Sequence, residues 1–411
     1  MKQIRIRGGT PLFGEVCVSG SKNAALPIIF ATIACKGKHR LDNVPDIGDV
    51  DTALRIIEQL GAKIIRSGTT LYIDTRELTY REPDESLTSR IRASSYLLGA
   101  MLARFGRCRL AATGGCNFSH RPIDLHIYAA RTLGASVTED TLYAPDGLRP
   151  SVLRFPMASV GATANALIMA ASADGVSEIY NYAREPHITA LSSFLVSAGA
   201  SIFFDDEKIT VRGGSLSGGS AVMIGDMIEA GTYLAAGIIT GGEVTVRGAD
   251  SRELSSFVEL LTALGCTVDC DTDTIRARAL RGPDSVTVEA MPYPAFPTDL
   301  QPIAAPLIAR LGCGMIIDRV WRERFGYLAA LADFGVRYRS GDGCAEIYRS
   351  ELHSARVTAP DLRGGAACLL CALAAEGESA INNAEIILRG YDSLDKKLRH
   401  IGAAANIENF Q

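Results

Sequence analysis

A short pattern occurs six times along the chain: an apolar residue, a glycine and a small residue that lead into a strand-like run. Its glycines are separated by 73, 65, 66, 70 and 67 residues and are Gly61, Gly134, Gly199, Gly265, Gly335 and Gly402. Self-similarity at a nearly fixed spacing indicates a fold built from repeated units. Six such units account for all 411 residues, so this repeat constrains the fold more than any other feature.

Each unit also contains a helix rich in Ala, Leu, Ile and Gly, a composition suited to burial on most sides. These six predicted helices span residues 21–36, 89–105, 159–174, 229–240, 298–311 and 361–376. A second helix in each unit is amphipathic, and in the fourth unit it ends at Gly265, with an apolar stripe made of Leu254, Phe257, Val258, Leu261 and Leu264. Strand-like runs between the helices include 16–19, 71–74, 244–247 and 285–289. The unit is therefore predicted to run strand–helix–strand–helix–strand–strand.

Three buried helices covered by sheets would fill one globule, so six units predict two similar α/β domains. A chain of 411 residues is long enough for two sizeable cores. No Pro/Gly/Ser-rich linker separates the two halves, and we therefore expect a short double-stranded hinge.

The charge balance bears on the class of partner. The chain carries 42 Lys and Arg against 46 Asp and Glu, a formal net charge of −4. Surfaces that bind nucleic acid or an anionic membrane need an excess of positive charge. A mildly acidic chain disfavours both kinds of partner.

The termini, apolar runs and cysteines predict a cytoplasmic protein. The first residues alternate charge and Ile like a strand and lack the apolar region of a signal peptide. The longest apolar run, residues 24–35, is shorter than the roughly 20 residues needed to span a bilayer. Ten scattered cysteines are then expected to be reduced thiols. We interpret the closely spaced pairs Cys266/Cys270 and Cys368/Cys371 as core residues and predict no metal site, because no further ligands complete a set of four.

One cysteine departs from this pattern. Residues 113–126 read Thr-Gly-Gly-Cys-Asn-Phe-Ser-His-Arg-Pro-Ile-Asp-Leu-His, a Gly-rich polar stretch with Cys116 at its centre. A free cysteine is most often an inert buried residue. Here His120 and Arg121 would favour the thiolate. We therefore predict that Cys116 is a reactive thiol on a flexible loop.

Several cations lie at predicted helix ends or turns. Lys22 follows Ser19-Gly20-Ser21 at the start of the first buried helix, where the backbone N–H groups favour an anion such as phosphate. A solvated lysine at a helix edge is the simpler interpretation. Arg92 opens the second buried helix, and Arg389 lies in a turn-like stretch late in the chain. Taken singly, each arginine is typical of surface charge.

Taken together, these segments resemble the UDP-N-acetylglucosamine enolpyruvyl transferase family. The resemblance runs from Ile4 to near the C-terminus. Its most specific parts are Gly20-Ser21-Lys22-Asn23-Ala24-Ala25-Leu26-Pro27, Arg92-Ala93-Ser94, and Gly114-Gly115-Cys116 with Arg121-Pro122-Ile123-Asp124-Leu125-His126. Further matches are Ser159-Val160-Gly161-Ala162-Thr163, Ala183-Arg184-Glu185-Pro186, Phe296-Pro297-Thr298-Asp299, Asp361-Leu362-Arg363 and Arg389-Gly390-Tyr391. The fold that it implies is two inside-out α/β barrel domains, each of three βαβαββ repeats. Residues 22–223 would form the domain with the Cys116 loop, and residues 1–21 and 224–411 the second.

The resemblance implies that the enolpyruvyl group of phosphoenolpyruvate is transferred to the 3-hydroxyl of UDP-N-acetylglucosamine, with release of phosphate. This reaction is the first committed step of peptidoglycan synthesis, and therefore of cell wall biogenesis, cell shape and division. The implied catalytic residues are Cys116 as the acid that also forms a pyruvate adduct, Asp299 as the base or the group that orients the hydroxyl, and Lys22. Phosphoenolpyruvate would contact Lys22, Asn23, Arg121 and Arg389. A helix N-cap is the structural alternative for Asp299.

By the same resemblance, UDP-N-acetylglucosamine would contact Arg92, Arg121, Pro122, Ile123, Asp124, Leu125, Ser159, Val160, Gly161, Asp299 and Val320. No metal or organic cofactor is implied, and fosfomycin-type epoxides are expected to alkylate Cys116. The chain departs from the family pattern in three places. Relatives carry Arg where this chain has Met227, Glu-Asn where it has Arg322-Glu323, and a small residue where it has His120.

Three other functions remain open. The chain could be an enolpyruvyl transferase with another acceptor, shikimate 3-phosphate, although the Gly-Gly-Cys loop favours the nucleotide sugar. An RNA-phosphate cyclase built from the same repeat would need a basic face, which the charge of −4 does not suggest. A non-catalytic paralogue that binds a UDP-sugar would be expected to lack part of the catalytic set, which is complete here.

Overall fold

The computed structural model describes residues 2–109, 114, 122–280 and 285–409, which fall into two compact units. We call the described residues between Gly20 and Ile224 the insert unit. The described residues of Met1–Ser19 and Gly225–Gln411 form the terminal unit. The boundaries predicted from the sequence, residues 22 and 223, differ from these by one or two positions.

The elements of the insert unit are α1 (Lys22–Ala34), β3 (Lys38–Asp42), α2 (Gly48–Gln59), β4 (Lys63–Ser67), β5 (Thr70–Asp74), α3 (Glu85–Thr88), η1 (Arg92–Tyr96), α4 (Leu97–Phe105), β6 (Arg107–Arg109), α5 (Asp124–Thr132), β7 (Ser136–Thr138), β8 (Thr141–Tyr143), β9 (Val152–Arg154), α6 (Val160–Ser172), β10 (Gly175–Tyr180), α7 (Pro186–Ser197), β11 (Ser201–Phe204), β12 (Lys208–Gly213) and β13 (Ser220–Val222).

The elements of the terminal unit are β1 (Lys2–Gly8), β2 (Phe13–Cys17), α8 (Met227–Ile239), β14 (Glu243–Arg247), η2 (Ser251–Leu254), α9 (Ser255–Ala263), β15 (Cys266–Cys270), β16 (Thr274–Ala279), β17 (Val286–Ala290), α10 (Gln301–Leu311), β18 (Gly314–Asp318), α11 (Leu328–Ala332), β19 (Arg337–Gly341), β20 (Cys344–Tyr348), β21 (Arg356–Thr358), α12 (Leu362–Ala374), β22 (Gly377–Asn382), α13 (Glu385–Leu388), α14 (Leu394–His400) and β23 (Ala404–Asn409).

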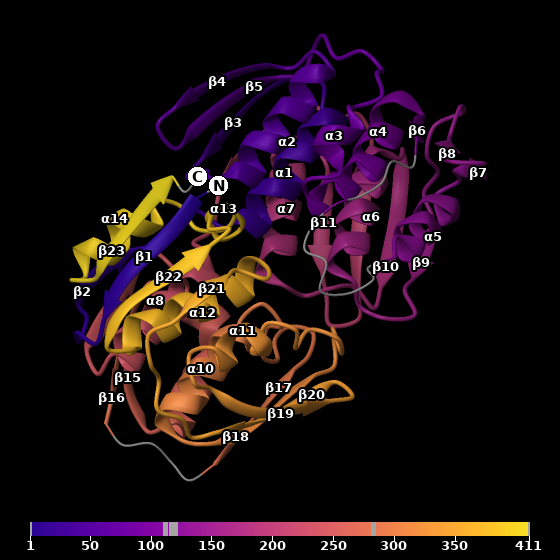
Figure 1. Ribbon diagram of the computed structural model, residues 1–411. Helices are drawn as coiled ribbons and strands as arrows, with labels where there is room; N and C mark the ends of the chain where they lie inside the picture. The colour runs from indigo at the N-terminus through magenta and orange to yellow at the C-terminus, as the bar shows by residue number, and fades with distance from the viewer. Residues whose placement is uncertain (1, 110–113, 115–121, 281–284, 410–411) are drawn as a thin grey trace. The chain divides into compact units, whose positions relative to one another are not determined.

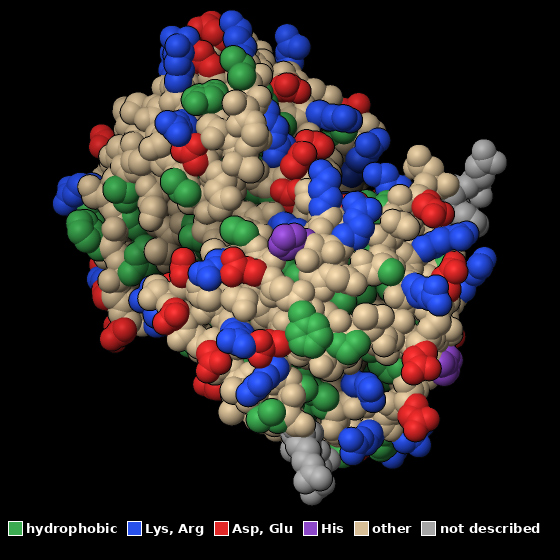
Figure 2. All heavy atoms as spheres, turned by 90° about the vertical axis from the view of Figure 1, so that its left-hand side faces the viewer, with side chains coloured by type: hydrophobic (Ala, Val, Ile, Leu, Met, Phe, Trp, Pro, Cys, Tyr) green, Lys and Arg blue, Asp and Glu red, His purple; other side chains and the backbone are tan. Residues whose placement is uncertain are grey.

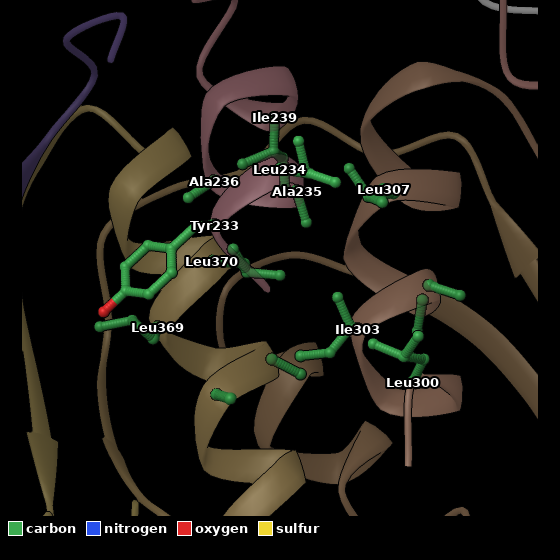
Figure 3. Close-up of a cluster of buried hydrophobic side chains, with 14 of the residues drawn as sticks. Tyr233, Leu234, Ala235, Ala236, Ile239, Leu300, Ile303, Leu307, Leu369 and Leu370 are labelled. Carbon is green, nitrogen blue, oxygen red and sulfur yellow. The ribbon is translucent and has the colours of Figure 1, made fainter. Parts of the chain in front are cut away.

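Each unit has helices at its centre and sheets around them, as the predicted buried helices require (Figure 1). In the terminal unit α8, α10 and α12 pack against one another. Leu234 of α8, Ile303 of α10 and Leu370 of α12 meet in the core shown in Figure 3, and each is fully buried. In the insert unit α1, α4 and α6 occupy the corresponding positions. The second predicted helix, residues 89–105, is divided into the 3₁₀ helix η1 and the α-helix α4.

The repeat glycines explain why six different sequences end their outer helices alike. All six have positive φ, from 78° to 121°, in the region that residues with a side chain rarely adopt. A glycine at this position ends a helix by the left-handed turn that redirects the chain into the next strand. These are Gly61, Gly134, Gly199, Gly265, Gly335 and Gly402.

The four-stranded sheets share one pattern, in which a parallel pair is followed by two antiparallel neighbours. Two sheets recruit their first strand from a distant part of the chain. β2 pairs in parallel with β14, and β13 pairs in parallel with β3. The strand predicted at residues 16–19 is therefore β2, but it completes the sheet of the fourth repeat and not that of the first. Similarly, β1 lies between β22 and β23 and completes the sheet of the sixth repeat.

Among the described residues, the chain passes between the units at Ser19–Gly20 and at Ile224–Gly225, and the glycine of each crossing is packed too tightly for a side chain. A Cβ atom at Gly20 would lie 1.7 Å from the carbonyl oxygen of Asn43, and one at Gly225 would lie 1.8 Å from that of Gly248. In the terminal unit, the Ser19 carbonyl accepts a hydrogen bond from the Asp226 N–H at 2.9 Å. Backbone contacts therefore hold Gly20 against the insert unit and Gly225 against the terminal unit.

A buried ion pair lies beside the first crossing. Nζ of Lys397 is 2.5 Å from Oε1 of Glu229, and both atoms belong to side chains that are mostly buried. The other Glu229 oxygen accepts a hydrogen bond from the Ser19 N–H at 2.8 Å. Burial raises the pKa of Glu229 to about 7, and Lys397 opposes this rise. The pair anchors the end of the segment that leads into the insert unit.

None of the helices in the described ranges combines the length and the apolar character that crossing a bilayer requires.

Candidate functional site

Two of the predicted site residues, Cys116 and Arg121, lie outside the described residues, as does His120. The others divide between the units. The insert unit holds Lys22, Asn23, Arg92, Pro122, Ile123, Asp124, Leu125, Ser159, Val160 and Gly161, and the terminal unit holds Asp299, Val320 and Arg389.

Lys22 is the first residue of α1, and its position is fixed by a carboxylate. Its Nζ lies 3.2 Å from Oδ2 of Asp49 in the first turn of α2, and the side chains are only 14% and 6% exposed. The Ser21 side chain makes no capping hydrogen bond, and its carbonyl oxygen accepts from the N–H groups of Ala24 and Ala25, at 3.2 and 2.9 Å. A held cation beside a helix N-terminus is suited to binding an anion. The half-buried Asn23 follows directly.

Arg92 opens η1 and contacts the segment that leads into α5. Its Nη2 donates a hydrogen bond to the Pro122 carbonyl oxygen at 3.2 Å. Ile123, Asp124 and Leu125 follow, with Asp124 as the first residue of α5. The structure therefore brings together the arginine and the 122–125 segment that the sequence analysis assigned to one ligand.

Asn165, which the sequence analysis did not select, holds this region together. Its Nδ2 donates to the Ser95 carbonyl at 3.0 Å and to Nδ1 of His126 at 2.7 Å, while its Oδ1 accepts from the Gly99 N–H at 2.6 Å. It thereby links α6 to η1, α4 and α5. A lone Asn in an otherwise apolar buried helix was the signal in the sequence, because a buried amide needs partners.

The same bonds define the state of His126. Since Nδ2 of Asn165 can only donate, Nδ1 of His126 is the acceptor and the ring is neutral. Burial, followed by the positive charge of Arg92, lowers the pKa of His126 to about 4. The α5 terminus that carries Asp124 is thus positioned by an uncharged histidine.

We expect the insert unit to lose stability as the pH falls from about 6.5 to 4. In that range the unfolded chain binds a proton at His126 that the folded unit does not, so the free energy of unfolding decreases by up to about 3 kcal/mol. His39, buried and with a pKa of about 4, adds a loss of the same sign. Urea unfolding at pH 7.5 and pH 5 would measure the change. A ring titration of His126 near pH 6.5 in NMR spectra would contradict it.

Ser159, Val160 and Gly161 form the N-terminus of α6. The Ser159 side chain caps the helix and accepts a hydrogen bond from the Ala162 N–H at 3.5 Å. All three residues are half-buried, so their backbone groups are partly accessible. The arrangement is compatible with the predicted contact to UDP-N-acetylglucosamine, because a helix N-terminus favours an anionic group such as a diphosphate.

Asp299 is bound by two buried arginines. Nη1 of Arg324 lies 2.8 Å from one carboxylate oxygen, and Nη2 of Arg363 lies 3.2 Å from the other. The arginine side chains are 4% and 3% exposed, whereas that of Asp299 is 31% exposed. The N-cap residue of α10 is Leu300, whose side chain makes no capping hydrogen bond, and Asp299 lies directly before it.

Val320 lies in a turn fixed by Asp318. Oδ1 of Asp318 accepts from the N–H groups of Val320 and Trp321, at 2.9 and 2.7 Å. Its other oxygen accepts from the Thr298 hydroxyl at 2.7 Å. Burial raises the pKa of Asp318. The N–H of Val320 is therefore bonded inside the protein.

Arg389 is the half-buried C-cap residue of α13. Two residues later, the buried Tyr391 hydroxyl is 2.9 Å from the Thr232 hydroxyl of α8. This bond fixes the turn after Arg389 to the core of the terminal unit.

The remaining predictions concern departures from the family pattern and the cysteines. Met227 begins α8 as a buried side chain, and the exposed Arg322 pairs with Asp342 at 2.5 Å. Cys368 and Cys371 lie in the core, as predicted. Cys266 is also buried, but Cys270 is exposed at the end of β15, so the prediction that both members of this pair are core residues is wrong. The strand alternates its side chains and ends at the surface.

The fold and the sequence are similar to those of known proteins. Residues 6–398 match the family model of EPSP synthase (3-phosphoshikimate 1-carboxyvinyltransferase). The structure is similar to the enolpyruvyl transferase NikO from Streptomyces tendae, with a TM-score of 0.90 and 26% identity over 100% of this chain and 99% of that one. It also shares its fold with EPSP synthase from Acinetobacter baumannii, at a TM-score of 0.71 and 17% identity over the full length of both chains. The predicted fold, two inside-out α/β domains, is confirmed. It defines a class, the carboxyvinyl transferases.

Two curated relatives narrow this class. UDP-N-acetylglucosamine 1-carboxyvinyltransferase from Prosthecochloris aestuarii is 38% identical and aligns over 100% of this chain and 99% of its own length. UDP-N-acetylglucosamine 1-carboxyvinyltransferase 3 from Caldanaerobacter subterraneus is also 38% identical, over 98% of each chain. The chain belongs to the UDP-N-acetylglucosamine 1-carboxyvinyltransferase family.

Proposed function

We propose that the protein transfers the enolpyruvyl group of phosphoenolpyruvate to the 3-hydroxyl of UDP-N-acetylglucosamine and releases phosphate. The full-length similarity to relatives of that name carries the proposal. In this role the protein would act in peptidoglycan synthesis, and hence in cell wall biogenesis, cell shape and division, in the cytoplasm.

Phosphoenolpyruvate brings a phosphate and a carboxylate, so its site needs several cations. We assign the contacts to phosphoenolpyruvate to the cations Lys22, Arg121 and Arg389 and to the amide of Asn23. The position of Lys22 at the N-terminus of α1, beside Asp49, supports its share of this role. Cys116 is proposed as the acid that protonates the methylene carbon and that forms the pyruvate adduct.

UDP-N-acetylglucosamine is assigned to the remaining residues. Arg92 and the 121–125 segment, together with 159–161, would bind the nucleotide, and the contact between Arg92 and Pro122 supports grouping them. Val320 would contribute a backbone contact. Asp299, which is accessible yet firmly held, would accept a hydrogen bond from the sugar hydroxyl.

Release of phosphate tests this function directly. The purified protein is mixed with phosphoenolpyruvate and UDP-N-acetylglucosamine, and inorganic phosphate is followed with time. We expect release only when both substrates are present, together with a product heavier than UDP-N-acetylglucosamine by one enolpyruvyl group. Each substrate alone is the control. No turnover, with nucleotide-sugar binding retained, would make the protein a binding paralogue.

Shikimate 3-phosphate is the second acceptor to test, because the matching family model describes a 3-phosphoshikimate enzyme. Turnover with shikimate 3-phosphate in place of the nucleotide sugar would replace the proposed acceptor. An RNA-phosphate cyclase is disfavoured by the net charge of −4. On the face in Figure 2, positive and negative side chains are interspersed and do not gather into a basic surface.

A further inference from the structure

A cavity of about 260 Å³ lies at the end of the terminal unit where α8 and α10 finish. In Figure 3, Ile239 and Leu307 lie near these C-terminal ends, and Leu300, which follows Asp299, lies at the other end of α10. Because α10 has 11 residues, it is about 16 Å long, and its length separates the cavity from Asp299. We propose that this cavity is a second binding site, which takes a monomeric anionic amphiphile: a carboxylate on an unbranched acyl chain.

The wall of the cavity is mostly apolar. Ile238 and Ile239 line it from the end of α8, and both are buried. Leu311 lines it from the last residue of α10, and Leu280, which follows β16, is 66% exposed. A water molecule occupies about 30 Å³ in the liquid, so the cavity has room for about eight non-hydrogen atoms. An acyl chain of that size would remove this apolar surface from water.

Two arginines lie side by side on the same wall. The Ser350 N–H donates to the Ala309 carbonyl oxygen at 2.8 Å, which brings their chain neighbours Arg349 and Arg310 together. Both arginines are exposed, and neither side chain forms a hydrogen bond or an ion pair with the residues that the structure describes. The described part of the wall contains no acidic residue. Neighbouring like charges repel each other, so this pair favours an anion from outside the chain.

The helix ends beside the cavity oppose such an anion only weakly. The last carbonyl groups of a helix carry partial negative charge when they lack partners. In α8 the Ile238 carbonyl accepts a hydrogen bond from the Gly241 N–H at 3.1 Å. In α10 the Ile308 carbonyl accepts one from the Gly312 N–H at 2.9 Å. Arg310, in the last turn of α10, offsets the partial charge that remains.

Sodium octanoate is the probe for this site, and 1-octanol is its uncharged match. The full-length protein, with ¹³C-labelled Ile and Leu methyl groups, is titrated with each compound. With octanoate we expect saturable shifts of the Ile239, Leu280 and Leu311 methyl signals and a dissociation constant below about 1 mM. Octanol should bind at least about 10-fold more weakly, because it makes no charge-assisted hydrogen bonds to the arginines.

Variants separate the charged part of the site from the apolar part. Arg310→Gln/Arg349→Gln should weaken octanoate binding at least about 10-fold and leave octanol binding unchanged. Leu280→Ser should weaken the binding of both compounds. Arg399→Gln, which removes an exposed ion pair with Asp395 in α14, is the matched control and should change neither. All of the substituted side chains are exposed, so these variants are expected to fold.

Surface arginines whose stems cover an apolar wall are the simpler interpretation. Equal binding of octanoate and octanol, or unchanged octanoate binding in the double arginine variant, would establish that interpretation and overturn the proposal. Binding to phosphatidylglycerol vesicles without binding of monomeric octanoate would identify a membrane contact and would overturn it as well. Each readout is a binding measurement, so a protein without enolpyruvyl transfer would contradict the proposed function and leave this inference in place.

Discussion

Lys22→Met should reduce kcat/KM for phosphoenolpyruvate by about 100-fold. The change removes a cation that is 14% exposed at the N-terminus of α1, where the proposed phosphate contact lies. A hydrogen bond to a charged group contributes up to about 3 kcal/mol, which corresponds to about 100-fold in rate. Steady-state kinetics with varied phosphoenolpyruvate would measure the effect. The KM for UDP-N-acetylglucosamine should change much less, because Lys22 is not assigned to it.

A double variant separates this effect from a loss of stability. Lys22→Met also deprives the buried Asp49 of its ion pair, which destabilises the fold independently of any substrate. Lys22→Met/Asp49→Asn removes both charges and should recover the free energy of unfolding without recovering activity. Recovery of activity in the double variant would show that Lys22 serves the fold and not phosphoenolpyruvate.

The repeat was predictable from the sequence because its signals are local. A glycine that ends a helix, and the apolar helix in each unit, are decided by residues within a few positions of one another. The helix predicted at 159–174 is α6, Val160–Ser172, and the one predicted at 361–376 is α12, Leu362–Ala374. Helix ends differ by one or two residues, which is the usual uncertainty of such boundaries.

The pairing of strands was not predictable in the same way. β2 and β14 lie on either side of the whole insert unit, and nothing in either strand specifies a partner more than two hundred residues away. Parallel neighbours are joined by long connections, so their pairing depends on the assembled fold. The exchange of β2 and β13 between sheets is therefore a property of the structure alone.

The candidate site shows the same limit. Asp299 was singled out through its motif, but its partners lie elsewhere in the chain, and Arg363 is separated from it by 64 positions. Asn165 was missed for a related reason, since its bonds to Ser95 and His126 cross three helices. Sequence patterns identify the chemical groups, whereas the contacts that set their charge and orientation arise only from tertiary packing.

Cys116→Ser should lower turnover by about 100-fold or more, because a hydroxyl is a poor acid near neutral pH and general acid catalysis contributes at least that much. Cys116→Asp should keep part of the activity, since a carboxyl group can still donate the proton. In the proposed reaction with fosfomycin, the thiolate forms a C–S bond as the epoxide C–O bond breaks. The serine and aspartate variants should both resist this modification, which intact-mass spectrometry detects as one added fosfomycin per chain.

The described cysteines supply the control for this labelling. Five of them, Cys35, Cys108, Cys266, Cys368 and Cys371, are buried, and burial raises the pKa of each. The exposed competitors are Cys17 and Cys270, and the pKa of Cys270 is raised by partial burial and by neighbouring acids. A Cys17→Ser/Cys270→Ser protein should therefore label as fast as the wild type, and faster when UDP-N-acetylglucosamine is bound. If peptide mapping instead placed the label on Cys17 or Cys270, or if Cys116→Ser kept full activity, Cys116 would have no part in the reaction, and the acid would have to be sought elsewhere in the chain.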